Sequence, residues 1–226
     1  RRQRQMCIRD RDTSKAFIKP NSEYWFGTDN LGRDYWCQVW YATQVSIRLA
    51  LIVAVGESIL GVIIGLIWGY VRKLDRFFTE LYNICDNIPS TIILILISYV
   101  ASPSIQTLIL GMSITGWIAM ARFIRNQILI IRDRDYNIAS RCIGTPTSRI
   151  VVRNLLPYLV SVIMLRMALT IPAAIGSEVF ITYIGLGLSV EIPSLGNLIN
   201  DGRKVMMQAG LRYQLLYPTI ILSLIH

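Results

Sequence analysis

The residues that could carry out chemistry are few in this chain of 226 residues. Its one histidine is His226, the last residue, so a serine triad, an HExxH zinc site or a histidine proton relay lacks its central member. Cys37, Cys85 and Cys142 are isolated, without the paired spacing of a zinc site or a disulfide framework, and we interpret them as packing residues. No G-x-x-x-x-G-K phosphate loop occurs. We therefore expect no catalytic, cofactor or metal site in this chain, and any ATP would have to be bound by another chain.

Two opposite charges stand inside long apolar runs. Glu57 and Arg166 lie near the middle of their runs, where an unpaired charge in lipid costs at least about 2.5 kcal/mol, so each should face a protein interior or the other. They could line a pathway, or they could form an ion pair that holds two helices together. We count Glu178 with them as a candidate for either role. The sequence does not decide between these roles.

The composition is that of a chain largely dissolved in lipid. Hydrophobic residues make up 53% of it, charged residues 16%, and the mean hydropathy is +0.47. A net charge of +9 would raise the question of nucleic acid in a soluble protein, but here membrane topology explains it, and we expect no nucleic-acid partner. Residues 1–11 resemble the translation of a sequencing-adapter end. We interpret them as foreign to the protein, although a genuine basic arm is the alternative; they hold five arginines and one aspartate, so without them the charge falls to +5.

A spanning helix needs about 20 mostly apolar residues. Four stretches meet this need: Val45–Tyr70, Leu81–Ala101, Thr107–Ile124 and Tyr158–Ile175. Pro89 lies near the cytoplasmic side of the second, and we expect Pro172 to interrupt the fourth near its end. A fifth stretch, Leu215–Ile225, would reach only about 18 Å at 1.5 Å per residue, so we expect residues 44–226 to be a transmembrane domain truncated in its last helix.

The arginines orient the predicted helices, because Lys and Arg concentrate in short cytoplasmic loops. They follow the first and the third stretch, which helix parity places on one side of the membrane: Arg72, Lys73, Arg76, Arg122, Arg125, Arg132, Arg134, Arg141, Arg149 and Arg153. This arrangement puts residues 12–43 and 177–213 outside. An outside start predicts a missing first helix before residue 12, and thus six helices in the intact protein.

Two further patterns concern packing and contact. Gly61, Gly65 and Gly69 form a ridge of small residues that lets another helix approach closely, the alternative being glycines that a membrane helix merely tolerates. Residues 135–143 predict a short amphipathic helix, ended by Gly144, after which Thr145 can cap a second helix. The apolar residues of the short helix fall on two adjacent rows: Ile138, Ala139, Cys142 and Ile143. Such a helix outside the bilayer either contacts a partner or lies among lipid headgroups.

At these residues the sequence resembles the binding-protein-dependent ABC permeases of the oligopeptide, dipeptide and nickel group. Their cytoplasmic signature is E-A-A, three residues, Gly, nine residues, then I-x-L-P. Four residues match it at that spacing: Ala139, Gly144, Leu156 and Pro157. Ile138 replaces the glutamate, Ser140 the second alanine and Asn154 the isoleucine. Three further segments also resemble this group: 26–34, 177–187 and 193–203.

The resemblance implies an all-α, polytopic transmembrane helix bundle of the type I importer permease kind, in a bacterial or archaeal plasma membrane. It implies a peptide permease working by alternating access beside a second, similar permease subunit, with ATP and Mg bound by two partner subunits and cargo delivered by an extracellular solute-binding protein. The helix before Gly144 would be the coupling helix that contacts an ATP-binding subunit. The residues so implied are Tyr136, Ile138, Ala139, Ser140, Cys142, Ile143, Gly144, Leu156 and Pro157.

Other functions stay open at this point. An ion-coupled secondary transporter could use Glu57 as a proton-coupled carboxylate and would need no ATP-binding partner. An ABC permease for nickel or another small solute would share the same segments. Transport by the isolated chain under an ion gradient would favour the first, and a cargo screen with the binding protein would separate the second.

The topology can be tested by labelling single cysteines with an impermeant reagent in intact cells. Because of the arginine distribution, we expect positions in 12–43 and 177–213 to be labelled from outside and positions in 72–80 and 122–157 to be protected. Labelling of position 137 from outside would contradict this topology.

Overall fold

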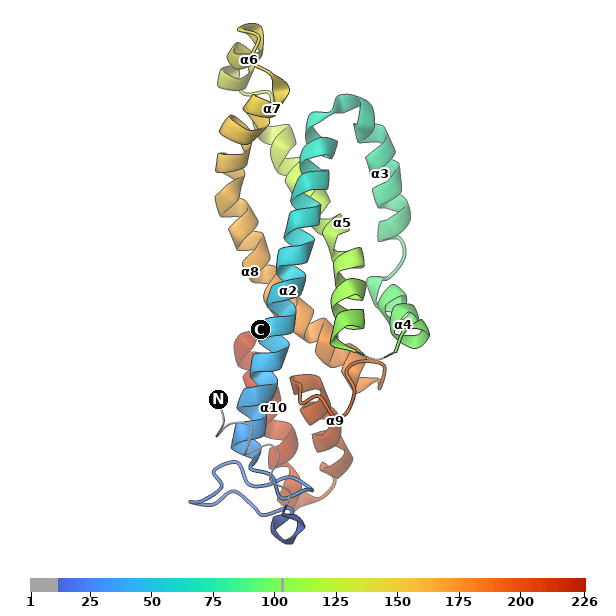
Figure 1. Ribbon diagram of the computed structural model, residues 1–226, viewed down its shortest axis with the longest axis vertical. Helices are drawn as coiled ribbons and strands as arrows, with labels where there is room; N and C mark the ends of the chain where they lie inside the picture. Colours follow the sequence, from blue (N-terminus) through green and yellow to red (C-terminus); the bar gives the residue numbers. More distant parts are fainter. Residues whose placement is uncertain (1–11, 103) are drawn as a thin grey trace. The chain divides into compact units, whose positions relative to one another are not determined.

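The computed structural model describes residues 12–102 and 104–226, which form helices and loops with one isolated β-bridge between Thr28 and Asp34 (Figure 1). The interpretation of residues 1–11 as foreign lies outside the described residues. The chain forms two compact units. The first holds the described residues up to Ala50, with Ser98–Leu108 and Pro172–His226, and the second holds Leu51–Ile97 and Ile109–Ile171.

Three helical stretches are long and apolar enough to cross a membrane, and they contain three of the predicted spans. They are α2 (Tyr35–Tyr70), α5 (Ile105–Ile131) and the continuous stretch Thr147–Tyr183, which joins α7 (Thr147–Ile150), the five-residue π-turn η2 (Val151–Leu155) and α8 (Leu156–Tyr183). A helix satisfies every backbone polar group within its own segment, which lipid cannot do. The predicted membrane helix bundle is therefore confirmed, although each helix extends beyond the apolar run that revealed it.

The second predicted span, Leu81–Ala101, is wrong as a single helix. The chain forms α3 (Arg72–Asp86) and α4 (Ser90–Val100), which are bent by 72° at the break between them. Pro89 lies in this break. It has no N–H to continue the helix, and it disfavours helical geometry at the residue before it. The two helices therefore amount to a broken span or a re-entrant loop.

The expected interruption at Pro172 is also wrong, because α8 continues through it to Tyr183. A proline removes one helical hydrogen bond, but a long apolar helix tolerates this loss by local adjustment, since leaving the helix in lipid would cost many more bonds. The loop predicted to start at residue 177 thus begins only after Tyr183. Pro218 is likewise held inside α10 (Tyr213–Ile225).

The apolar core of the second unit lies where α2, α5 and the start of α8 meet. Its buried members are Met120, Ile124, Ile128, Ile131, Ile150, Leu155 and Leu159. The glycine ridge of α2 faces this core. A Cβ atom added at Gly61 would lie 2.5 Å from Met120 Cβ, and one added at Gly69 would lie 2.7 Å from Ile128 Cβ. The glycines therefore let the backbone of α2 approach α5, which runs beside it in Figure 1.

Two arginines of α5 hold α3 in the same unit. Arg125 donates to both carboxylate oxygens of Asp75, at 2.7 and 2.9 Å. The guanidinium of Arg122 lies 4.2 Å from the ring centre of Tyr82. These polar and cation–π contacts add to the packing of Phe78 and Tyr82 of α3 against Trp68 of α2.

The first unit combines the loop before α2 with α9 (Leu195–Val205) and α10, and with the short turns η1 (Thr13–Lys15) and η3 (Ala209–Leu211). The Tyr213 hydroxyl donates to the Thr28 carbonyl at 2.7 Å, and the Tyr35 hydroxyl donates to the Gln214 carbonyl at 2.6 Å. Segment 26–34, which resembles the permease group in sequence, is therefore a hydrogen-bonded loop and not a free tether.

Gly65 should not accept a side chain. A Cβ atom there would lie 2.6 Å from the Ala121 carbonyl oxygen and 2.7 Å from Ile124 Cβ, so Gly65→Leu should lower stability by about 1 kcal/mol or more, as other overpacking changes do. Thermal unfolding of the purified chain in detergent measures this. The control is Gly176→Ala in α8, where an added Cβ atom meets nothing within 4 Å. An unchanged melting temperature for Gly65→Leu would contradict the close packing.

Candidate functional site

The short helix predicted at residues 135–143 is present as α6 (Asp135–Cys142), and a complete Schellman motif ends it. Gly144 has φ +82°, its N–H donates to the Arg141 carbonyl at 2.9 Å, and the Thr145 N–H donates to the Ser140 carbonyl at 3.0 Å. The expectation that Thr145 caps the next helix is wrong. Pro146 occupies that position and has no side-chain oxygen to accept a hydrogen bond, so no side chain caps α7.

All the apolar residues of α6 and its end point into open space. Ile143 is 84% exposed, Tyr136 47% and Ile138 44%, and Ala139 and Cys142 are exposed as well. Ser140 differs from them, because its hydroxyl donates to the Tyr136 carbonyl at 2.8 Å and so turns back onto the helix. The exposed apolar residues form one continuous contact surface on a helix of eight residues. We call it the α6 face.

A cluster of charges, which sequence reasoning missed, surrounds the start of α6. Asp133 accepts from Arg132 at 3.1 Å, from Arg72 at 3.4 Å and from Arg141 at 3.5 Å. Partial desolvation disfavours the Asp133 carboxylate, but the hydrogen bond from Arg132 and the three positive charges outweigh it, so the pKa of Asp133 lies below its ordinary value. The one signal in the sequence was an aspartate between two arginines.

The same arginines tie α6 to the end of α2. Arg141 donates to the Arg132 carbonyl at 2.6 Å, and its guanidinium lies 5.4 Å from the ring centre of Tyr70. Arg132 in turn donates to the Gly69 carbonyl at 2.7 Å. Two arginines thus bridge from the glycine ridge to α6. A movement of α6 would therefore act on the end of α2 through charged hydrogen bonds, which are stronger than neutral ones.

The other two residues implied by the signature, Leu156 and Pro157, lie at the start of α8 and not on the α6 face. The π-turn η2 directly precedes them. Pro157 cannot donate to the Arg153 carbonyl, and its ring would clash with that carbonyl in a regular helix, so the wider turn relieves the conflict. Leu156 and Pro157 therefore shape the helix that carries α6, and the structure does not bring them into the contact surface.

Glu57 and Arg166 do not form an ion pair in the described part of the chain. The Glu57 carboxylate lies against Gly116, where an added Cβ atom would collide with it, and the Arg166 guanidinium lies 5.7 Å from the Phe123 ring centre. The Phe123 ring is therefore a partner of the Arg166 cation.

Glu178 is fully buried in the first unit and has hydroxyl partners in place of the expected cation. Its carboxylate accepts from the Ser46 hydroxyl at 3.0 Å and from the Thr182 hydroxyl at 3.1 Å. The Ser46 hydroxyl also accepts the N–H of Leu195, the first residue of α9, at 3.3 Å. Glu178 therefore forms no ion pair within the described residues and joins α2, α8 and α9 through hydrogen bonds.

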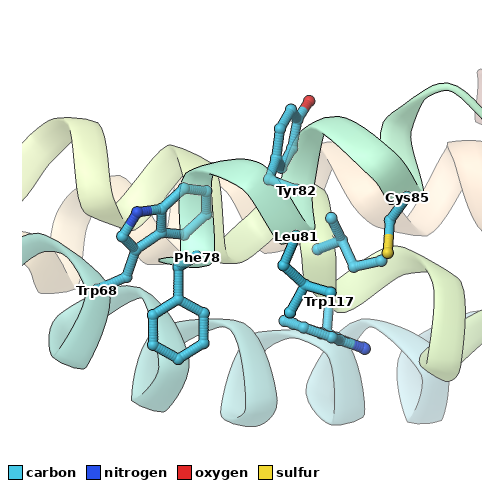
Figure 2. Close-up of a pocket in the computed structure, with 7 residues that line it drawn as sticks. Trp68, Phe78, Leu81, Tyr82, Cys85 and Trp117 are labelled. Carbon is cyan, nitrogen blue, oxygen red and sulfur yellow. The ribbon is translucent and has the colours of Figure 1, made fainter. Parts of the chain in front are cut away.

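A small hollow lies between α2, α3 and α5 (Figure 2). Its lining is mostly aromatic: Trp68, Phe78, Leu81, Tyr82, Cys85, Trp117 and Ile118. The volume inside is about 10 Å³, which is the room that one water molecule needs. Within the described residues, no three His, Cys, Asp or Glu side chains gather as a metal site.

Glu178 should be necessary for the stability of the first unit. Glu178→Leu removes the acceptor of two buried hydroxyls and should lower the unfolding free energy by about 1–3 kcal/mol, whereas Glu178→Gln keeps an acceptor and should cost less. Thermal unfolding in detergent distinguishes them, with the exposed Glu191→Leu as the control. Equal melting temperatures for Glu178→Leu and Glu191→Leu would show that the hydrogen bonds contribute nothing.

Known permeases are similar to this chain over most of its length. The oligopeptide transport system permease protein AmiD of Streptococcus pneumoniae is 42% identical over 214 residues, covering 94% of this chain and 70% of the relative. The dipeptide transport system permease protein DppC of Bacillus subtilis is 34% identical, covering 92% of this chain and 65% of the relative. The oligopeptide transport system permease protein OppC of Bacillus subtilis is 35% identical, covering 81% and 60%. The chain thus spans 60 to 70% of the length of these relatives.

The fold agrees with these sequence relatives. A solved chain of the MetNI methionine ABC transporter, in an inward-facing conformation, superposes with a TM-score of 0.69 at 20% identity, covering 84% of this chain and 92% of that chain. A family model described as the binding-protein-dependent transport system inner membrane component matches residues 61–225. The chain therefore belongs to the family of binding-protein-dependent transport system inner membrane components.

Proposed function

We propose that this chain is the permease subunit of an ATP-driven peptide importer and that α6 is its coupling helix. The observation that carries the proposal is the α6 face. Apolar residues on a helix that lies between two membrane spans gain free energy only when something covers them. A cleft in an ATP-binding subunit would cover this face. That subunit, and not this chain, would bind ATP and Mg.

The cargo follows from the relatives and not from a visible site. Those reported above are named for oligopeptide or dipeptide transport, and they match over 81 to 94% of this chain. This supports peptides over nickel or another small solute. The hollow of Figure 2 is too small for a peptide, and we propose that cargo passes along a surface that a second permease subunit completes.

A second permease subunit has apolar surface available to it. Much of the apolar run in Thr147–Tyr183 is exposed: only 17% of its most apolar stretch is buried within the chain. Met164, Leu165 and Leu169 are each about 60% exposed. Lipid covers part of this surface in a bilayer, and a similar subunit would cover the rest. Alternating access would then consist of one subunit moving against the other.

The ion-coupled transporter is the weaker reading. It would need Glu57 to exchange a proton with solvent, and the carboxylate lies against the backbone of α5 at Gly116. It would also leave the α6 face without a use. An α6 lying in the lipid headgroup layer is the remaining alternative for this helix, and the experiment below separates it from docking to a protein.

The α6 face should lose its function when it carries a charge. Ala139→Asp places a carboxylate in an apolar contact, which costs several kcal/mol unless it finds a partner. We expect uptake to fall and the ATPase activity of the reconstituted complex to lose its dependence on cargo. Thr147→Asp in α7 is the control, since Thr147 is also exposed but lies outside the α6 face. Cross-linking from position 139 to the ATP-binding subunit should succeed.

Wild-type cargo stimulation in Ala139→Asp, with no cross-link and with quenching of a probe at position 139 by spin-labelled lipid, would favour the headgroup layer instead. Position 137 is unsuited to labelling tests of sidedness, because Asn137 is buried and a cysteine there would be shielded from either side. Ile143, at 84% exposure, is the discriminating position.

The turn at Gly144 should set the direction of α6. An added Cβ atom would meet nothing within 4 Å, so a substitution there acts only through φ +82°, which costs other residues about 1 kcal/mol or more. Gly144→Val should therefore reduce cargo-stimulated ATPase activity, and Gly144→Asn, which tolerates this conformation, should reduce it less. Equal activities for the two variants would contradict a conformational role. Abundance of both in the membrane provides the control for insertion.

A further inference from the structure

The attachment of α6 to the rest of the chain is polar where helix packing is usually apolar. Asn137 is the one buried residue of α6, with a relative exposure of 0%. Every apolar residue of this helix is exposed. The position of α6 against its own chain therefore depends on hydrogen bonds, which are directional, and not on hydrophobic burial, which is not.

The Asn137 side chain joins three elements. Its amide nitrogen donates to the carbonyl of Ile131, the last residue of α5, at 2.8 Å. Its amide oxygen accepts from the Asn154 amide in η2, at 3.0 Å. The Ile131 carbonyl belongs to the last turn of α5 and also accepts from the Arg134 N–H at 3.3 Å, so the asparagine gives it a second donor.

Both groups to which the Asn137 side chain bonds lie beside residues that are buried in the apolar core. Ile131 and Leu155, which adjoin the two hydrogen bonds, are each 0% exposed in the core of the second unit. The ion pair between Arg141 and Asp133 lies on the solvent-exposed side of α6. Its two side chains are 36% and 44% exposed, and solvent weakens an ion pair at such a site. Asn137 is thus the shielded attachment of α6.

Asn154 is also a departure from the family signature, which has isoleucine at that position. The structure gives this departure a partner, because Asn154 bonds to Asn137 and to no other side chain in the described part of the chain. We propose that Asn137 and Asn154 form a positioning pair that carries displacement of α6 to the ends of α5 and α8. This inference rests on the proposed coupling role of α6 and names the joint through which that role is exerted.

A double-mutant cycle in the reconstituted complex tests the pair. The readout is the ratio of cargo-stimulated to unstimulated ATPase activity, with peptide uptake alongside. Asn137→Val leaves the Asn154 amide without its acceptor, and Asn154→Ile leaves the buried Asn137 oxygen without its donor. Each single change should lower the ratio by about tenfold, the scale of one unsatisfied buried group.

The double variant separates a transmitting role from a merely structural one. With both partners apolar, neither polar group of the pair is left unsatisfied, so we expect the melting temperature to recover, while the ratio stays about tenfold below wild type because the hydrogen bond between α6 and η2 is absent. A merely structural role would give the opposite result, with the ratio recovering along with the melting temperature. The control is Asn126→Val in α5, an exposed asparagine that should leave the ratio unchanged.

The outcomes separate this inference from the function on which it rests. If a charge at the α6 face abolishes stimulation while Asn137→Val and Asn154→Ile both keep the wild-type ratio, α6 couples but the asparagine pair does not position it. If neither kind of change matters, the coupling role itself is wrong. Membrane abundance and melting temperature are measured for every variant, and should Asn137→Val not assemble, Asn154→Ile against Asn126→Val decides alone.

Discussion

The close contact of α2 with α5 at the glycine ridge is the constraint on which the rest of the second unit depends. Gly61, Gly65 and Gly69 have no side chain, so the residues of α5 pack directly on the α2 backbone. This contact also sets the place of the Gly69 carbonyl, which accepts from Arg132. A bulkier residue in the ridge would move the α2 backbone away, and the attachment of α6 through Arg132 would move with it.

Farther from that contact, the interactions that hold the helices together change from apolar to polar. The core around Ile128, Ile150 and Leu155 is apolar, whereas α6 is held by Asn137 and by arginines. The difference has a physical reason. If the apolar residues of α6 packed against their own chain, they would not be available to a partner. Hydrogen bonds hold the helix in place while its apolar face stays free, so the free energy of burying that face is released only when a partner docks.

The sequence predicted the parts of the fold that follow from period and charge. Apolar length located α2, α5 and α8, and the turn at Gly144 followed from glycine alone. Two prolines misled the prediction in opposite ways. Pro172 stays inside a helix because lipid offers its backbone no other partner, whereas Pro89 lies in a break where the chain bends. Local sequence contains both prolines but not the surroundings that decide between these outcomes.

The polar anchors were harder to predict because their partners lie far along the chain. Glu178 bonds to Ser46, 132 positions away, and Asn137 bonds to Asn154, 17 positions away. An expected pairing of charges was natural for Glu57, Glu178 and Arg166, since lipid penalises each of them. Yet an aromatic ring can take up a cation and hydroxyls can satisfy a carboxylate, and these neutral partners leave no charge pattern to detect.

Two departures from the family signature now have complementary meanings. Ile138 stands where the signature has a glutamate, and it lies on the exposed α6 face, so the change adds apolar surface to the contact. Asn154 stands where the signature has isoleucine, and it points to the buried side of α6, so the change adds a hydrogen bond to the attachment. A more apolar contact surface strengthens docking without fixing direction, because hydrophobic contact is non-directional. The asparagine pair supplies the direction that such a surface lacks, which is why the two departures are compatible in one helix with the proposed coupling role.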